Sequence, residues 1–266
     1  MLKHFVLQQV LEYTKQKDKP FWYIDTHAGA GLYALNTGYA MQNAEYKEGI
    51  DKLIAADGLP PALQDFVSLI TQFNTNPSMR LYPGSPAIAQ QLLRADDKMR
   101  LFELHPNDYK FLAENFKGNG RQTKVEMQNG FAGLKAILPP PSRRAVVLID
   151  PPYEDKQDYQ TVISACKKAL STFETGTYMV WYPLLHRQEP VEMLAELQDL
   201  PLKNWLNVSL SISQPSNDGF GMFGSGIFII NPPWTLPNIL AETMPVLRDL
   251  LALDNAASFE LSHEIS

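Results

Sequence analysis

The segment Asp150-Pro151-Pro152-Tyr153 offers the chemistry of amino-group methylation. It directly follows the apolar run Ala145–Ile149, which is typical of a buried parallel strand, and such sheets bind ligands at the carboxyl ends of their strands. The Asp150 carboxylate and a carbonyl of the rigid proline turn can accept both hydrogens of an exocyclic amine. The nitrogen lone pair is then freer to attack a methyl sulfonium. We therefore predict Asp150 and Tyr153 as catalytic residues, with Pro151, Pro152 and Tyr153 binding the substrate and the Tyr153 ring stacking on its base.

A second segment, Asn231-Pro232-Pro233-Trp234, has the same kinds of residue in the same order. It follows the last predicted strand, which we expect to be antiparallel and which is far in sequence from the glycine-rich loop described next. Asp150 instead ends the fourth strand, counted from the strand before that loop. We therefore interpret Asn231–Trp234 as a structural turn.

The loop in question, Asp25-Thr26-His27-Ala28-Gly29-Ala30-Gly31, follows the short apolar run Phe21–Asp25. Its glycines allow the backbone to approach a ligand, and a helix that begins after such a loop favours polar or anionic groups. Asp25, His27 and Gly29 are thus candidate cofactor residues. Glu103, an acid at the end of the next predicted strand, fits an acceptor for ribose hydroxyls. A glycine turn that binds nothing is the alternative interpretation.

Alternating strands and helices must position these segments, which predicts an α/β fold with a largely parallel, doubly wound sheet. Residues 39–80 have helical periodicity, so we predict a small helical insertion within a single domain that spans residues 1–266. After the glycine loop we expect a helix. The other predicted elements are an N-terminal helix, the strands Met99–Glu103, Lys124–Gln128, Ala145–Ile149, Thr177–Tyr182, Trp205–Ser211 and Ser225–Ile230, and the helices Ala87–Leu93, Asp108–Phe116, Tyr159–Phe173 and Gln188–Leu197.

The composition excludes several classes of protein. The chain has 266 residues, 23 Lys plus Arg and 29 Asp plus Glu, so its formal charge of −6 argues against a polybasic coat for nucleic acid. One cysteine and five scattered histidines offer no cluster for a structural zinc. Its apolar runs are too short to cross a membrane, and the start lacks a signal peptide. We expect a cytoplasmic protein, with no metal and no membrane partner.

Several motifs in one order resemble the RlmJ family of ribosomal RNA large-subunit adenine-N6 methyltransferases. They are Asp25–Gly31, Tyr82–Pro86, Glu103–Pro106, Ser142–Arg144, Leu148–Tyr153, Gly176–Tyr178 and Ile230–Trp234. The resemblance implies a Rossmann-like class I methyltransferase fold, with a mostly parallel seven-stranded sheet that has one antiparallel strand. It also implies S-adenosylmethionine as the methyl donor, an adenine in 23S ribosomal RNA as the acceptor, and no metal. We expect a monomer.

By matching position, the resemblance implies that His4, His27, Ser85, Glu103 and Asn129-Gly130 line the cofactor site, with Asp150 as the catalytic acceptor and Tyr153 against the target base. This sequence differs from the family pattern at two places. The family carries Asp at the position of Asn129. Its members also have a segment rich in His, Arg and Tyr ahead of the pair that is Lys3-His4 here.

Other functions suit the same acceptor turn. Within enzymes, the alternatives are methylation of adenine in DNA and methylation of the amide nitrogen of a protein glutamine. A protein that binds the cofactor without turnover, as an RNA chaperone or an accessory in the use of external DNA, is the alternative from another class.

Overall fold

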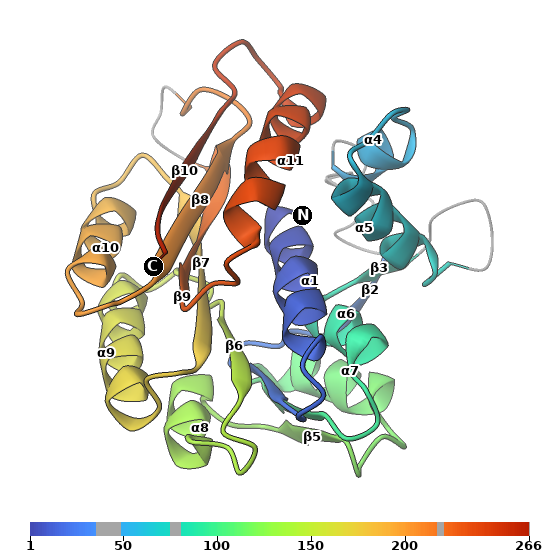
Figure 1. Cartoon of the computed structure of the whole chain (residues 1–266), viewed down its shortest axis with the longest axis vertical. Helices are drawn as coiled ribbons and strands as arrows, with labels where there is room; N and C mark the ends of the chain where they lie inside the picture. The colour runs from blue at the N-terminus through green and yellow to red at the C-terminus, as the bar shows by residue number, and fades with distance from the viewer. Residues whose placement is uncertain (36–48, 75–80, 217–220, 266) are drawn as a thin grey trace.

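The computed structural model describes residues 1–35, 49–74, 81–216 and 221–265. Its centre is an eight-stranded sheet in the order β10-β8-β9-β7-β6-β1-β4-β5 (Figure 1). The strands of this sheet are β1 (Trp22–Asp25), β4 (Lys98–Phe102), β5 (Thr123–Glu126), β6 (Ala145–Ile149), β7 (Thr177–Leu184), β8 (Trp205–Ser211), β9 (Gly224–Ile230) and β10 (Ser258–Glu264).

The directions of these strands confirm the α/β fold predicted from the sequence and correct its strand count. β5, β4, β1, β6 and β7 are parallel neighbours, whereas β9 pairs antiparallel with β7 and β8 pairs antiparallel with β9. The prediction of seven strands with one antiparallel strand omitted β10, which pairs antiparallel with β8 at the edge of the sheet. Two strands, β9 and β10, therefore run opposite to the others.

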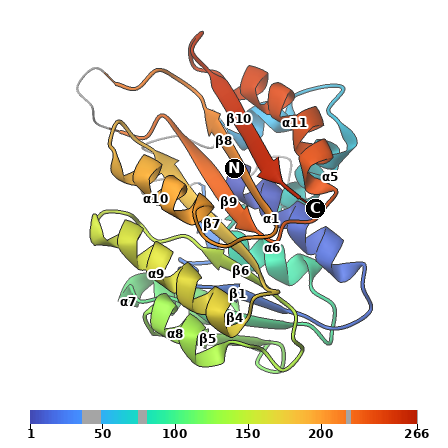
Figure 2. The ribbon, with the colours of Figure 1, turned by 60° about the vertical axis from the view of Figure 1, so that its left-hand side comes forward.

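Helices cover both faces of the sheet (Figures 1 and 2). The residues of β6 are all buried and alternate between two apolar clusters, because this strand is covered on both sides. One cluster includes side chains from α1 (Leu2–Lys15), α5 (Pro61–Thr71), α6 (Ser85–Leu92), α7 (Pro106–Asn115) and α11 (Leu236–Leu251), and the other from α8 (Gly130–Ile137), α9 (Gln157–Thr172) and α10 (Glu189–Gln198). Among the described residues no helix has the length and apolarity needed to cross a bilayer.

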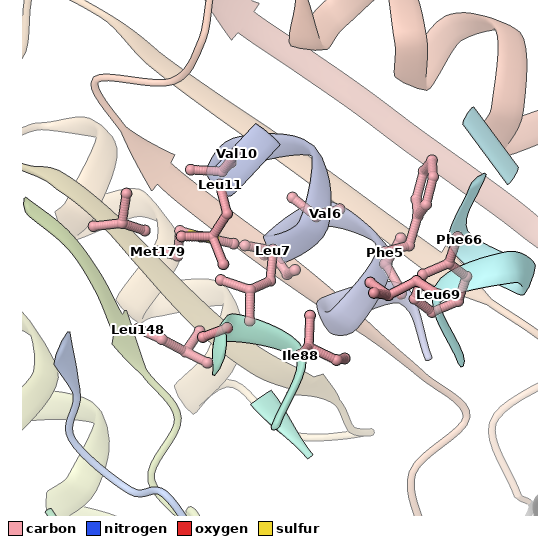
Figure 3. Close-up of a cluster of buried hydrophobic side chains, with 14 of the residues drawn as sticks. Phe5, Val6, Leu7, Val10, Leu11, Phe66, Leu69, Ile88, Leu148 and Met179 are labelled. Carbon is pink, nitrogen blue, oxygen red and sulfur yellow. The ribbon is translucent and has the colours of Figure 1, made fainter. Parts of the chain in front are cut away.

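Helix α1 is the centre of the first apolar cluster. Leu7 and Leu11 project from α1 toward the part of the sheet that carries Leu148 and Met179 (Figure 3). On another side of the helix, the ring of Phe5 contacts that of Phe66 on α5 edge-on, with centroids 5.7 Å apart. Burial on more than one side fixes the position of α1, and with it the polar residues of its first turn.

The predicted insertion separates the glycine loop from its helix. The loop leads into a short strand, β2 (Leu32–Ala34), which pairs antiparallel with β3 (Leu81–Pro83), and the Gly84 N–H donates to the Gly31 carbonyl at 3.0 Å. The prediction of a helix directly after the loop is therefore wrong, because α6 takes that place only after Gly84. The described part of 39–80 contains α4 (Ile50–Ile54) and α5, and its other residues lie outside the described ranges.

Candidate active site

Asp150 lies at the carboxyl end of β6, as predicted, and forms an ion pair with Lys3 of α1. The two residues are 147 positions apart in sequence. They meet because α1 packs on the face of the sheet to which Leu148 of β6 contributes. Their side chains are 15% and 21% exposed, respectively, so the pair is mostly shielded from water but can be reached from solvent. Asp150 is therefore an accessible acceptor at the edge where parallel sheets bind ligands.

Burial and mutual attraction set the charges of this pair. Burial opposes the charge on Lys3, but the ion pair and hydrogen bond with Asp150 hold the pKa of Lys3 above its ordinary value. Burial raises the pKa of the Asp150 carboxyl, and the Lys3 ammonium opposes that rise. The ammonium thus supports a carboxylate at a site where burial alone would favour the neutral acid.

Tyr153 does not lie where the sequence analysis placed it. Its side chain is only 3% exposed, and its hydroxyl donates to the carbonyl of Trp181 at 2.7 Å. The ring packs against Tyr159, with centroids 4.6 Å apart. A left-handed backbone (φ 54°) at Tyr153 turns the side chain into the core. The predicted stacking on a target base disagrees with this placement, so Tyr153 supports the turn from beneath.

The second proline segment is a structural turn, which confirms the interpretation from the sequence. Asn231 follows β9, whose antiparallel pairing places Ile230 beside Tyr178, at the opposite edge of the sheet from Asp150. The Asn231 side-chain amide donates to the carbonyls of Glu174 and Gly176, at 2.8 Å each. Its φ of 54° is one that asparagine tolerates. Asn231 therefore closes a turn far from the candidate site.

Glu103 holds the glycine loop in place. The Gly29 N–H donates to one oxygen of its carboxylate at 2.8 Å, and the His105 N–H donates to the other at 2.7 Å. Gly29 has a φ of 58°, which favours glycine. Glu103 remains partly exposed, and each carboxylate oxygen can accept more than one hydrogen bond. The structure thus brings together the loop and the predicted ribose acceptor.

Gly130 begins α8 directly against the glycine loop. A Cβ at this position would overlap the Thr26 carbonyl oxygen and would lie 2.5 Å from the carbonyl carbon. The neighbouring Asn129 is exposed and is the N-cap of α8, since its side-chain oxygen accepts from the Ala132 N–H at 3.1 Å. Asp and Asn both serve as N-caps, so the difference from the family pattern at this position preserves the cap.

We expect Asn129→Asp to keep the stability of the protein and Asn129→Ala to lower it by about 1 kcal/mol, because alanine cannot accept the Ala132 N–H. Urea denaturation of the three proteins measures this difference. Equal midpoints for the alanine variant and the wild type would show that the cap contributes nothing.

Asp25 lies beneath the glycine loop instead of at its surface. It has no exposed surface, and its carboxylate accepts from the hydroxyls of Tyr23 and Ser85, at 2.7 Å each. Ser85 is 4% exposed, so neither of these two predicted cofactor residues can contact a ligand directly in this conformation. Burial raises the pKa of Asp25 to about 6, against the opposing effect of the hydrogen bonds from Ser85 and Tyr23.

This shift predicts a pH dependence of stability. Since the folded pKa is above the ordinary value of 3.8, the folded protein binds the proton more tightly, and its stability falls as pH rises from about 4 to 6. The contribution of Asp25 to this fall is about 3 kcal/mol. In Asp25→Asn the fall should be smaller, and in Ser85→Ala, which removes a hydrogen bond to the carboxylate, it should extend to higher pH. Urea denaturation between pH 4 and 8 tests this, and parallel curves for the wild type and Asp25→Asn would refute it.

The two histidines predicted for the cofactor site are held neutral. Burial lowers the pKa of His27 to about 4, and burial together with the nearby Lys3 lowers the pKa of His4 well below its ordinary value. Nδ1 of His4 lies 3.0 Å from the Tyr82 hydroxyl, and His4 itself is buried. His27 remains partly exposed in the loop. Of the two, only His27 presents surface to a ligand.

Lys3 is a residue at the candidate site that the sequence analysis missed. The available signal was a charged residue close in the sequence to the apolar residues Leu2, Phe5 and Val6 of a predicted amphipathic helix. The local sequence pattern did not identify Asp150 as the partner of Lys3, because this ion pair depends on how α1 packs against the sheet. Within the described parts of the chain, no three His, Cys, Asp or Glu residues are grouped as a metal site would require.

Comparisons with known proteins identify the family of this chain. A family model described as ribosomal RNA large subunit methyltransferase D, RlmJ, matches residues 18–262. The chain is 43% identical over 251 residues to ribosomal RNA large subunit methyltransferase J of Escherichia coli (strain K12), in an alignment that covers 94% of this chain and 89% of the relative. It is 42% identical over 260 residues to the protein of the same name from Haemophilus influenzae, with coverages of 97% and 92%.

A solved structure agrees as well. A protein from Legionella pneumophila (strain Philadelphia 1) superimposes with a TM-score of 0.90 at 34% identity, over 98% of this chain and 95% of that one. Sequence and fold therefore match over nearly the whole length. This chain belongs to the RlmJ family of ribosomal RNA large subunit methyltransferases.

Proposed function

We propose that this protein is an S-adenosylmethionine-dependent methyltransferase that methylates N6 of an adenine in large-subunit (23S) ribosomal RNA. The observation that carries the proposal is the position of the Asp150 carboxylate, at the end of β6 and accessible beside the glycine loop that follows β1, its parallel neighbour. Family membership supports the RNA substrate.

The residues around the glycine loop fit the cofactor. Gly130 lets α8 begin in direct contact with the backbone of Thr26, so the start of this helix lies against the glycine loop, and the partly exposed Glu103 carboxylate can accept ribose hydroxyls. Leu104 and Met127, which follow β4 and β5, expose large apolar side chains suited to an adenine ring. When bound there, S-adenosylmethionine supplies a methyl group on a positively charged sulfur.

The acceptor amine would be held by Asp150 and the adjacent backbone. No described residue donates a hydrogen bond to the carbonyl of Pro151, so this carbonyl and the Asp150 carboxylate can each accept one N–H of the amine. A carboxylate has about four acceptor sites, so an amine can share Asp150 with Lys3. Methylation replaces one N–H by N–CH₃, and Asp150 is a base within hydrogen-bond reach of the proton released.

An exposed segment of RNA is the substrate that suits this site. A base inside a duplex must be extruded at a cost of a few kcal/mol, and a single strand avoids much of that cost. With a net charge of −6, the protein must bind RNA through local contacts and the base pocket. We propose that the enzyme acts as a monomer in the cytoplasm, where a ribosomal RNA substrate is found.

The test offers labelled S-adenosylmethionine with deproteinised large-subunit RNA, duplex DNA or total protein in parallel. We expect the label in RNA, as N6-methyladenine identified by mass spectrometry of the nucleosides. Label in DNA or in protein glutamine would support the corresponding alternative enzyme, and binding of the cofactor without transfer to any acceptor would refute the catalytic proposal.

A further inference from the structure

Trp181 is the immediate neighbour of Asp150 in the sheet. β6 and β7 are parallel, and their pairing places Ile149 beside Val180. The next residues along the two chains are Asp150 and Trp181, so the carboxylate and the indole leave adjacent strands at the same level. In a parallel pair, residues at the same level point to the same side of the sheet.

That side is the one that α1 covers. Met179, two residues before Trp181 on β7, faces α1 beside Leu11 (Figure 3), and side chains two apart on a strand share a face. The position of Lys3 agrees with this placement of Trp181. Its Nζ donates a hydrogen bond to Asp150 and also lies 5.8 Å from the centroid of the Trp181 ring. Trp181 and Asp150 therefore border the same space at the end of α1.

Trp181 is also an aromatic residue that a ligand at Asp150 can reach. Its side chain is partly exposed, whereas Tyr153 is buried with its hydroxyl bonded to the Trp181 carbonyl. The rings of Tyr153 and Trp181 lie 6.1 Å apart at 45°. Tyr153 thus supports the strand segment that presents the indole.

We propose that Trp181 is the ring on which the acceptor adenine stacks while Asp150 holds the amine. This inference rests on the proposed function and names a substrate-binding residue for it. A purine has a flat π-face that an indole binds well, and the Lys3 ammonium shows that this space accepts a positively charged nitrogen beside the ring. The same ring would therefore favour the positive charge that develops on N6 as it takes the methyl group.

The test compares Trp181→Leu and Trp181→Phe with the matched control Trp234→Leu. Trp234 is 67% exposed and follows the Asn231 turn at the opposite edge of the sheet, so its removal should leave methyl transfer unchanged. We expect Trp181→Leu to raise KM for deproteinised ribosomal RNA about 10- to 100-fold and Trp181→Phe to raise it less. The affinity for S-adenosylhomocysteine, measured by calorimetry, should stay that of the wild type in all three variants.

An unchanged KM in folded Trp181→Leu, with the wild type active on RNA, would overturn the stacking role and leave the proposed function standing. A rise in KM accompanied by an equal loss of cofactor affinity would also overturn it, since that pattern indicates general distortion of the site. If the wild type transfers no methyl group to RNA, the proposed function fails. The role of Trp181 is then decided by nucleotide binding, observed through ¹⁹F resonances of labelled tryptophans.

The ¹⁹F measurement requires neither enzymatic activity nor a folded Trp181→Leu variant. The chain has four tryptophans, so protein labelled with 5-fluorotryptophan gives four ¹⁹F resonances, and the one missing in Trp181→Phe belongs to Trp181. We expect adenosine monophosphate, added with S-adenosylhomocysteine, to shift the Trp181 resonance and leave that of Trp234 in place. A Trp181 resonance that does not move at saturating nucleotide would refute the inference.

Discussion

Asp150→Asn is expected to lower kcat for methyl transfer about 10³-fold while the affinity for the cofactor stays that of the wild type. Asparagine keeps one oxygen acceptor but replaces the other by an N–H₂ group, which repels the amine it should hold. It also leaves Lys3 without its anionic partner. Initial rates with ribosomal RNA and calorimetry with S-adenosylhomocysteine measure the two quantities separately.

Two further proteins separate the possible causes of this loss. Lys3→Met/Asp150→Asn removes both charges, so it should recover stability relative to Asp150→Asn and remain inactive. Asn231→Gly tests the second proline segment: glycine tolerates the φ of 54° but cannot donate to Glu174 and Gly176, so stability should fall and transfer persist. Wild-type turnover by Asp150→Asn would refute the mechanism, and loss of transfer in folded Asn231→Gly would move the acceptor to that turn.

Gly130→Ala is expected to destabilise the protein by about 3 kcal/mol or more and to abolish cofactor binding. The added methyl group would overlap backbone atoms of Thr26, and relief requires α8 and the glycine loop to move apart. These two segments are the walls of the proposed cofactor site, so stability and affinity should fall together. Thermal unfolding with and without S-adenosylhomocysteine measures both effects.

Gly120→Ala is the matched control, because a Cβ there would meet no atom within 4 Å. Its thermal midpoint and the shift caused by ligand should equal those of the wild type. If the two alanine variants behave alike, the close approach of Gly130 to Thr26 has no role in stability or binding.

Local sequence was sufficient to predict the parallel part of the sheet and the position of Asp150 at the end of β6. Every residue of Ala145–Ile149 is apolar because β6 is buried on both faces, and the acid after such a strand must lie at the edge where ligands bind. The antiparallel strand before Asn231 was predictable from its late place in the chain. These features depend on short segments whose pattern reflects their own burial.

The features that escaped prediction depend on contacts between distant segments. β10 is an edge strand whose residues are mostly exposed. The sequence Ser258–Glu264 therefore shows little of the apolar pattern that a buried strand has. The pairing of Lys3 with Asp150 is set by the packing of α1. The direction of the Tyr153 ring depends on one backbone angle, which the four-residue motif does not specify.

The burial of α1 also links an early segment of the chain to one that is synthesised much later. α1 is synthesised long before β9, against which it packs and which ends at Ile230, about 215 residues later. At about 5–20 residues per second, translation of that stretch takes about 10–40 s. Throughout this interval α1 can pack against α5 and α6 but lacks its contact with β9. A nascent chain therefore carries the Asp150–Tyr153 segment before the packing around α1, which brings Lys3 to Asp150, is complete.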